Sequence, residues 1–173
     1  KVKNFDDLYR RFNIEIINNE FYEHYKNLFL NLANKLNKDK EFSAFANKIN
    51  LKISDFSKKL LGQIIFCYFL QKKGWLGVDK NKSFGFGDTS FLRNQFIKYQ
   101  NEKKNFFNDF LEFFFYRGLN NQNDNDYVKE IDCRVPYIGG GLFEYYEGYD
   151  WETEQLNIPN STFSNKEGNG ILD

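Results

Sequence analysis

The chain has 173 residues, and its 24 Lys and Arg balance its 24 Asp and Glu, so the formal net charge is zero. Aromatic residues make up 20% of the chain against only two Pro, which favours packed helices over turn-rich folds. The longest apolar run of the central region, residues 60–70, is shorter than the ~20 residues that cross a bilayer. We therefore expect one mainly α domain that is cytoplasmic and has no membrane partner.

The ends and the cysteines indicate the protein's context. The chain begins at Lys1 rather than Met and has no charged-then-apolar leader, so we expect both ends to be cuts in a longer protein. Cys67 and Cys133 lack the short spacing and the His partners that a zinc site requires. We predict two free thiols and no metal site.

Charge is distributed unevenly along the chain. Residues 1–104 carry 20 Lys and Arg against 11 Asp and Glu, a net charge of +9. Residues 105–173 carry 4 against 13, a net charge of −9. This opposition indicates either that the two parts face each other, which is the preferred interpretation, or that the first part meets an acidic partner such as DNA.

Two helices are predicted before residue 40. Asn4 can cap a short helix through Phe12, because its side-chain oxygen can accept from free amides. Residues 14–17 are strand-like or looped, and an Asn after them caps a second helix. The apolar stripe of this second helix is Phe21, Tyr25, Leu28, Phe29, Leu32 and Leu36.

The strongest predicted element is a central helix over residues 54–73. Ile65 and Phe69 widen its apolar arc, which places it in the core. Its two terminal lysines suit the negative end of the helix dipole, and Gly74 after them can take a left-handed conformation. We expect Trp75 to fold back on the last turn.

Two further helices follow a polar, Gly-bearing loop over residues 77–90. Ser90 can start a helix that continues through Tyr99. The next helix, over residues 105–117, is crowded with Phe, so that apolar groups cover most of its circumference. We expect it to be buried between other elements or covered by a neighbouring domain that this chain lacks.

The pattern divides the chain into three parts. A multi-helix core spans residues 1–119. Residues 120–132 form an Asn- and Asp-rich connector that is too polar to contribute a core element. Residues 133–173 are Gly-rich and dominated by loops, with at most a short hairpin. They are expected to pack on the helices or on a missing downstream domain.

Two glycine-bearing segments invite functional interpretations. Residues 84–88, Phe-Gly-Phe-Gly-Asp, are similar to a loop that binds S-adenosylmethionine, but Gly would be needed at positions 86 and 88, so a flexible loop is preferred. The triple glycine at 139–141 lacks the rest of a phosphate-binding motif, which favours a structural turn. The predicted structural loop contains Pro136, Gly139, Gly140, Gly141, Leu142 and Phe143.

No catalytic residue is predicted. The single histidine, His24, lies among charged neighbours on a helix, where a solvent-exposed side chain is expected. Five acidic residues could bind a hard cation if they folded together, but they lack EF-hand spacing, so a solvated acidic surface is preferred. They are Glu144, Glu147, Asp150, Glu152 and Glu154.

Basic residues close to aromatic ones are the candidates for DNA contact. Lys and Arg beside aromatic faces could follow a nucleic-acid backbone, although ordinary solvent-facing side chains explain the pattern equally well. The predicted DNA-backbone contacts are Lys72, Lys73, Arg93, Lys103 and Lys104.

Three segments together resemble a known family. They are residues 21–26 (FYEHYK), 61–76 (LGQIIFCYFLQKKGWL) and 135–144 (VPYIGGGLFE). In this order they are similar to the helical region upstream of the adenine-specific DNA methyltransferase domain in type IIG restriction–modification enzymes and related BREX-type phage-defence methylases. Ile138 and Gly139 replace the Leu-Asn that is common in the family's loop.

The resemblance implies a parent enzyme that methylates the exocyclic nitrogen of adenine in DNA with S-adenosylmethionine, often with an endonuclease on the same chain. The methyltransferase signature Asn-Pro-Pro-Tyr is absent, so this chain is expected to bind no cofactor and to be non-catalytic. Its implied role is to connect other domains of the parent and to position them on DNA. A stand-alone, nonspecific DNA-binding module is the alternative, and an enzyme that uses the Gly-rich C-terminal segment is a third hypothesis.

Overall fold

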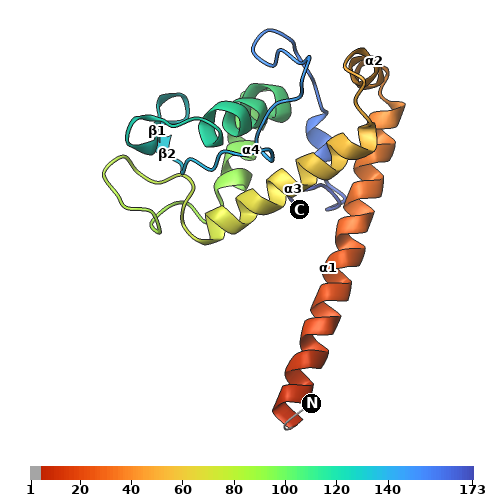
Figure 1. Ribbon diagram of the computed structural model, residues 1–173, viewed down its shortest axis with the longest axis vertical. Helices are drawn as coiled ribbons and strands as arrows, with labels where there is room; N and C mark the ends of the chain where they lie inside the picture. Colours follow the sequence, from red (N-terminus) through yellow and green to blue (C-terminus); the bar gives the residue numbers. More distant parts are fainter. Residues whose placement is uncertain (1–4) are drawn as a thin grey trace.

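The computed structural model describes the backbone of residues 5–173 and the side chains of residues 19–173. The fold is mainly α, as predicted (Figure 1). Within residues 5–173, none of the helices combines the length and the apolar character that a bilayer crossing requires. The main elements are α1 (Phe5–Lys38), α2 (Lys40–Lys48), α3 (Ile53–Lys72), α4 (Phe91–Asn101), the π-helical turns η1 (Phe107–Leu111) and η2 (Phe114–Leu119), and the strands β1 (Tyr127–Val128) and β2 (Cys133–Arg134).

Helix α1 is continuous over 34 residues, so the predicted break at residues 14–17 is wrong. The span contains no Gly or Pro, and an Ile costs a helix only about 0.7 kcal/mol or less relative to Ala, which is too little to interrupt it. The predicted cap, Asn4, lies outside the described residues. Figure 1 shows α1 extending well beyond the other elements, with its C-terminal part beside α2 and α3. There Leu32 and Leu36 enter the core.

Helix α2 was not predicted, although its start is encoded locally. The carboxylate of Asp39 accepts a hydrogen bond from the Phe42 amide at 3.0 Å, which is a standard N-cap. The helix then buries Phe42 and Ala46, one turn apart, on the face that meets the core. Because the helix is short, its apolar stripe contains too few residues to be conspicuous in the sequence.

Helix α3 lies at the centre of the molecule and ends as predicted. Gly74 adopts a left-handed conformation with φ of 67°, which glycine tolerates without strain. Its amide donates to Gln71 O at 2.9 Å, and the Trp75 amide donates to Leu70 O at 3.0 Å. These two bonds satisfy the carbonyls of the last turn in the Schellman pattern.

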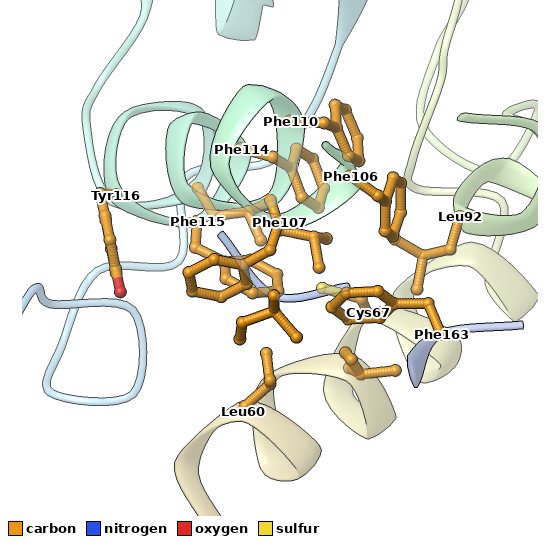
Figure 2. Close-up of a cluster of buried hydrophobic side chains, with 14 of the residues drawn as sticks. Leu60, Cys67, Leu92, Phe106, Phe107, Phe110, Phe114, Phe115, Tyr116 and Phe163 are labelled. Atoms are coloured by element: carbon orange, nitrogen blue, oxygen red, sulfur yellow. The ribbon is translucent and has the colours of Figure 1, made fainter. Parts of the chain in front are cut away.

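The phenylalanine-rich segment 106–119 packs over α3 and is largely π-helical. Phe106, Phe110 and Phe114 stack in succession along it, with ring centroids 5.3 Å apart at each step (Figure 2). All three side chains are fully buried by other parts of this chain. The first of the two expectations for this helix, burial between other elements, is therefore confirmed.

The short hairpin straddles the start of the loop-rich segment in which it was predicted, with β1 in the connector and β2 at the beginning of residues 133–173. Strands β1 and β2 pair antiparallel, with Val128 opposite Cys133, and an isolated bridge joins Val78 to Arg134. Val128 and Ile131 belong to the buried core, so the expectation that residues 120–132 are too polar to contribute to it is wrong. A two-residue strand turns only one side chain toward the core. The mean polarity of the whole segment does not reveal a single buried residue of this kind.

Candidate nucleic-acid interface

The structure divides the five predicted basic residues between the two ends of α4. The first turn of α4 is tied to the end of α3, because the Leu92 amide donates to Gln71 Oε1 at 3.0 Å. The 11 residues of α4 then span about 16 Å. The five residues therefore do not form one cluster. Lys72, Lys73 and Arg93 lie near the first end, and Lys103 and Lys104 follow the second.

Two of the five side chains are paired with carboxylates of this chain. Arg93 Nη1 donates to Asp173 Oδ1 at 3.0 Å, and also to Ser164 Oγ at 2.7 Å. Lys104 Nζ lies 2.6 Å from Glu102 Oε2. Each of these cations would have to exchange its own partner for a phosphate. Arg93 and Lys104 are therefore weaker candidates for DNA contact than their sequence context indicates.

Lys72 and Lys73 are exposed at the end of α3. Neither has a carboxylate within ion-pair distance among the side chains of residues 19–173. The Lys73 ammonium lies 5.7 Å from the centre of the Phe69 ring, at the distance of a cation–π contact. Lys103 is likewise exposed and without an ion-pair partner among these side chains, but it lies at the far end of α4, so Lys72 and Lys73 are the pair of available candidates at one place.

Three exposed aromatic side chains accompany the lysines, and none of them was predicted from the sequence as a DNA contact. Phe69, Trp75 and Phe86 are 53%, 40% and 74% exposed. Trp75 and Phe86 belong to segments that are hydrogen-bonded to each other, because the amides of Gly85 and Gly87 both donate to Gly74 O at 2.8 Å. The lysine–aromatic end of α3 consists of Phe69, Lys72, Lys73, Trp75 and Phe86.

The loop that carries Phe86, which was expected to be flexible, is hydrogen-bonded to the residues that follow α3. A Cβ at Gly87 would lie 2.2 Å from Leu76 O, so the close approach of the two backbones requires glycine. The Asp88 amide also donates to Leu76 O, at 2.8 Å. Arg134 holds the other side of the loop by donating to Lys82 O at 2.6 Å. These contacts place the segment that carries Phe86 next to the end of α3.

The predicted structural loop folds back on the chain's own helices. Phe143 is fully buried, with its ring centroid 5.9 Å from that of Phe66 and 5.6 Å from that of Phe115. Gln63 on α3 donates to Leu142 O at 2.8 Å. Of the two surfaces on which residues 133–173 were expected to pack, Phe143 therefore uses the helices rather than a missing domain.

The turn before Phe143 uses its glycines as predicted. Gly139 and Gly140 adopt left-handed conformations with φ of 63° and 74°, which suit residues without a Cβ. Gly141, between them and Leu142, has no such backbone angle. Pro136 is partly buried at the start of the loop. The glycines thus allow the sharp reversal that directs Phe143 inward.

The remaining candidates are dispersed, and they form no metal site in the described part of the chain. His24 is exposed, and both cysteines are buried free thiols. Burial raises the pKa of the Cys133 thiol to about 12, which disfavours the thiolate form at neutral pH. Among the described residues, no three His, Cys, Asp or Glu side chains gather in a way that could hold a metal ion.

No protein-family model, curated protein or solved structure matches the chain. Function is therefore inferred from the chemistry of the residues at the candidate site. Two unpaired ammonium groups can neutralise phosphates, and neighbouring exposed aromatic rings can stack on bases. Neither interaction forms or breaks a covalent bond.

Proposed function

We propose that this chain is a non-catalytic helical connector of a bacterial N6-adenine DNA methyltransferase in a restriction–modification or phage-defence system, and that it helps to position DNA in the cytoplasm. The resemblance of residues 21–26, 61–76 and 135–144 to the region upstream of such methyltransferase domains supports this assignment. The observation that carries the DNA contact is the lysine–aromatic end of α3, where unpaired Lys72 and Lys73 adjoin exposed aromatic rings.

The contact would be weak and independent of sequence. Ammonium groups that neutralise phosphates carry no base information, and their contribution fades as salt displaces them. The aromatic rings would add stacking with unpaired bases, which is also tolerant of sequence. Recognition of a target sequence would therefore belong to other domains of the parent chain.

The S-adenosylmethionine of the parent would also be bound elsewhere. The one segment of this chain that is similar to a cofactor loop, residues 84–88, uses its backbone amides within its own turn. Its Gly85 and Gly87 amides donate to Gly74 O, and its Asp88 amide donates to Leu76 O. These donors are consequently engaged in holding the turn. Methyl transfer is assigned to a domain other than this one.

A paired substitution tests the DNA contact. Lys72→Gln with Lys73→Gln should weaken binding of a labelled duplex at low salt, measured by fluorescence anisotropy. It should also reduce the slope of log affinity against log salt by about 2, close to 0.9 for each lost phosphate contact. The matched control is Lys52→Gln with Lys58→Gln, which removes the same charge at the other end of α3. Equal affinity and slope for the two double variants would contradict the proposal.

The coding sequence downstream of residue 173 separates the connector from the stand-alone module. An Asn-Pro-Pro-Tyr signature within a following domain is expected if the chain belongs to an adenine methyltransferase. A different domain there would overturn the methyltransferase assignment. The DNA contact would then have to be interpreted as the activity of an independent binding module.

A further inference from the structure

A second surface feature lies on the acidic, C-terminal part of the molecule. It is a hollow of about 670 Å³ between the end of the segment 106–119 and the loop that follows residue 144. Four of its lining residues are aromatic and two carry carboxylates. We call it the acidic aromatic hollow, and its defining residues are Tyr116, Tyr145, Tyr149, Asp150, Trp151 and Glu152.

The aromatic rings of the hollow are held in fixed relative positions. Tyr116 is buried between Tyr145 and Trp151, with ring centroids 6.2 and 5.7 Å away and both rings close to edge-on. Figure 2 shows Tyr116 set apart from the phenylalanine cluster, with its hydroxyl directed away from that cluster. Tyr149 is also buried, and its hydroxyl donates to Glu112 Oε1. Tyr116 and Tyr149 therefore support the hollow from below, and the aromatic side chains that a ligand can reach are the partly buried Trp151 and the exposed Tyr145.

The electrostatic environment of the hollow is negative. Its lining contains Asp150 and Glu152 but no Lys or Arg. It belongs to the segment 105–173, which carries 13 Asp and Glu against 4 Lys and Arg. The nearby Glu154 is paired with Lys48 at 2.5 Å, whereas the two lining carboxylates have no ion-pair partner among the described side chains.

We propose that the acidic aromatic hollow binds an organic cation, namely an alkylammonium or guanidinium group. Aromatic faces attract such cations through the ring quadrupole, and an adjacent carboxylate adds a charge-assisted hydrogen bond. A hard metal ion fits less well, because it requires several converging oxygen ligands and the described residues provide no such group. The cation can come from a free polyamine or from a Lys or Arg side chain of another protein segment.

The two tryptophans of the chain provide separate reporters, because Trp151 lines the hollow and Trp75 lies at the end of α3. The chain labelled with ¹⁵N would be titrated with spermidine and with N-acetyl-lysine methylamide at constant ionic strength, and the two indole N–H signals followed. Both ligands should shift the Trp151 signal in a saturable manner and leave the Trp75 signal in place. Binding of spermidine at least tenfold tighter would indicate a free polyamine as the source, and similar affinities would indicate a side chain.

Magnesium chloride at the same ionic strength is the control for simple charge attraction. An equal shift of Trp151 with Mg²⁺, or no shift with either organic cation up to about 10 mM, would overturn the proposal. Tyr145→Ala and Glu152→Gln should each weaken spermidine binding about two- to fivefold. Glu147→Gln removes an equivalent exposed charge outside the hollow and should leave binding unchanged. Identical effects of Glu147→Gln and Glu152→Gln would also contradict a defined site.

Discussion

Glu112 is a fully buried carboxyl group in the segment 106–119. Its Oε1 accepts the Tyr149 hydroxyl at 2.5 Å, while its Oε2 is buried without a hydrogen-bond partner among the described residues. Burial raises the pKa of Glu112 to about 8, and the hydrogen bond from Tyr149 offsets only part of this rise. Glu112 is therefore mostly protonated at neutral pH in the folded protein.

This pKa predicts a specific pH dependence of stability. The folded-state pKa lies above the unfolded value of about 4.3, so the favourable contribution of the protonated group is complete below about pH 4 and is lost as the pH rises through about 8. Glu112→Gln keeps an acceptor for Tyr149 and does not titrate. Urea unfolding should show similar free energies for both proteins at pH 5 and a more stable Gln variant at pH 9. A difference that stays constant across this range would contradict the account.

Phe86 is the most exposed aromatic residue of the lysine–aromatic end of α3, and this exposure makes a stacking role testable. Phe86→Ala should change the free energy of unfolding by less than about 0.5 kcal/mol, because the ring buries little surface. Base stacking contributes about 1–3 kcal/mol, so affinity for a single-stranded oligonucleotide should fall about fivefold or more. Ile97→Ala, which removes an exposed apolar side chain from α4, is the control. Equal oligonucleotide affinities of the two variants would exclude stacking by Phe86.

At the scale of elements, the loop 135–144 is anchored by one side chain. Phe143 lies between the rings of Phe66 and Phe115 and is fully buried. Phe143→Ala should therefore reduce the free energy of unfolding by about 3 kcal/mol or more, measured by urea denaturation. Phe86→Ala is the matched control, because it makes the same change at an exposed position. A loss below 1 kcal/mol for Phe143→Ala would show that the loop does not depend on this anchor.

Elements whose boundaries are encoded locally were predictable. The end of α3 follows from its terminal lysines and Gly74, and the structure shows the expected left-handed glycine. The continuity of α1 was not predictable, since the β-branched residues at 14–17 suit a strand as well as a helix. Helix α2 could have been predicted only from its N-cap residue, Asp39, because just two buried side chains follow it.

The candidate interface was predictable only in part, because the sequence does not show which face of α3 its neighbours cover. Lys72 and Lys73 were identified from their charge and their position after an apolar helix. Phe69 was assigned to the core because it widens the apolar arc of α3, but it is more than half exposed. Helical periodicity defines the faces of a helix, whereas the width of the buried face depends on which neighbours cover it. The sequence alone does not specify that coverage.

At the scale of the whole molecule, the two oppositely charged parts do meet. Lys48 pairs with Glu154, and Arg93 pairs with Asp173, so two ion pairs join residues 1–104 to residues 105–173. The preferred interpretation of the charge asymmetry is thereby supported. The pairs leave Lys72 and Lys73 without a partner among the described side chains, and the proposed DNA contact concerns this remaining basic surface.

The most direct test of the DNA contact is hydrogen exchange of the chain with and without duplex DNA at low salt. The account predicts slower exchange of amides in residues 77–88, the loop that carries Phe86 beside Lys72 and Lys73, on binding. Amides of residues 135–144 should be unaffected, because that loop packs inward through Phe143. Unchanged exchange in residues 77–88, with protection confined to another surface, would contradict the proposal that DNA binds at the lysine–aromatic end of α3.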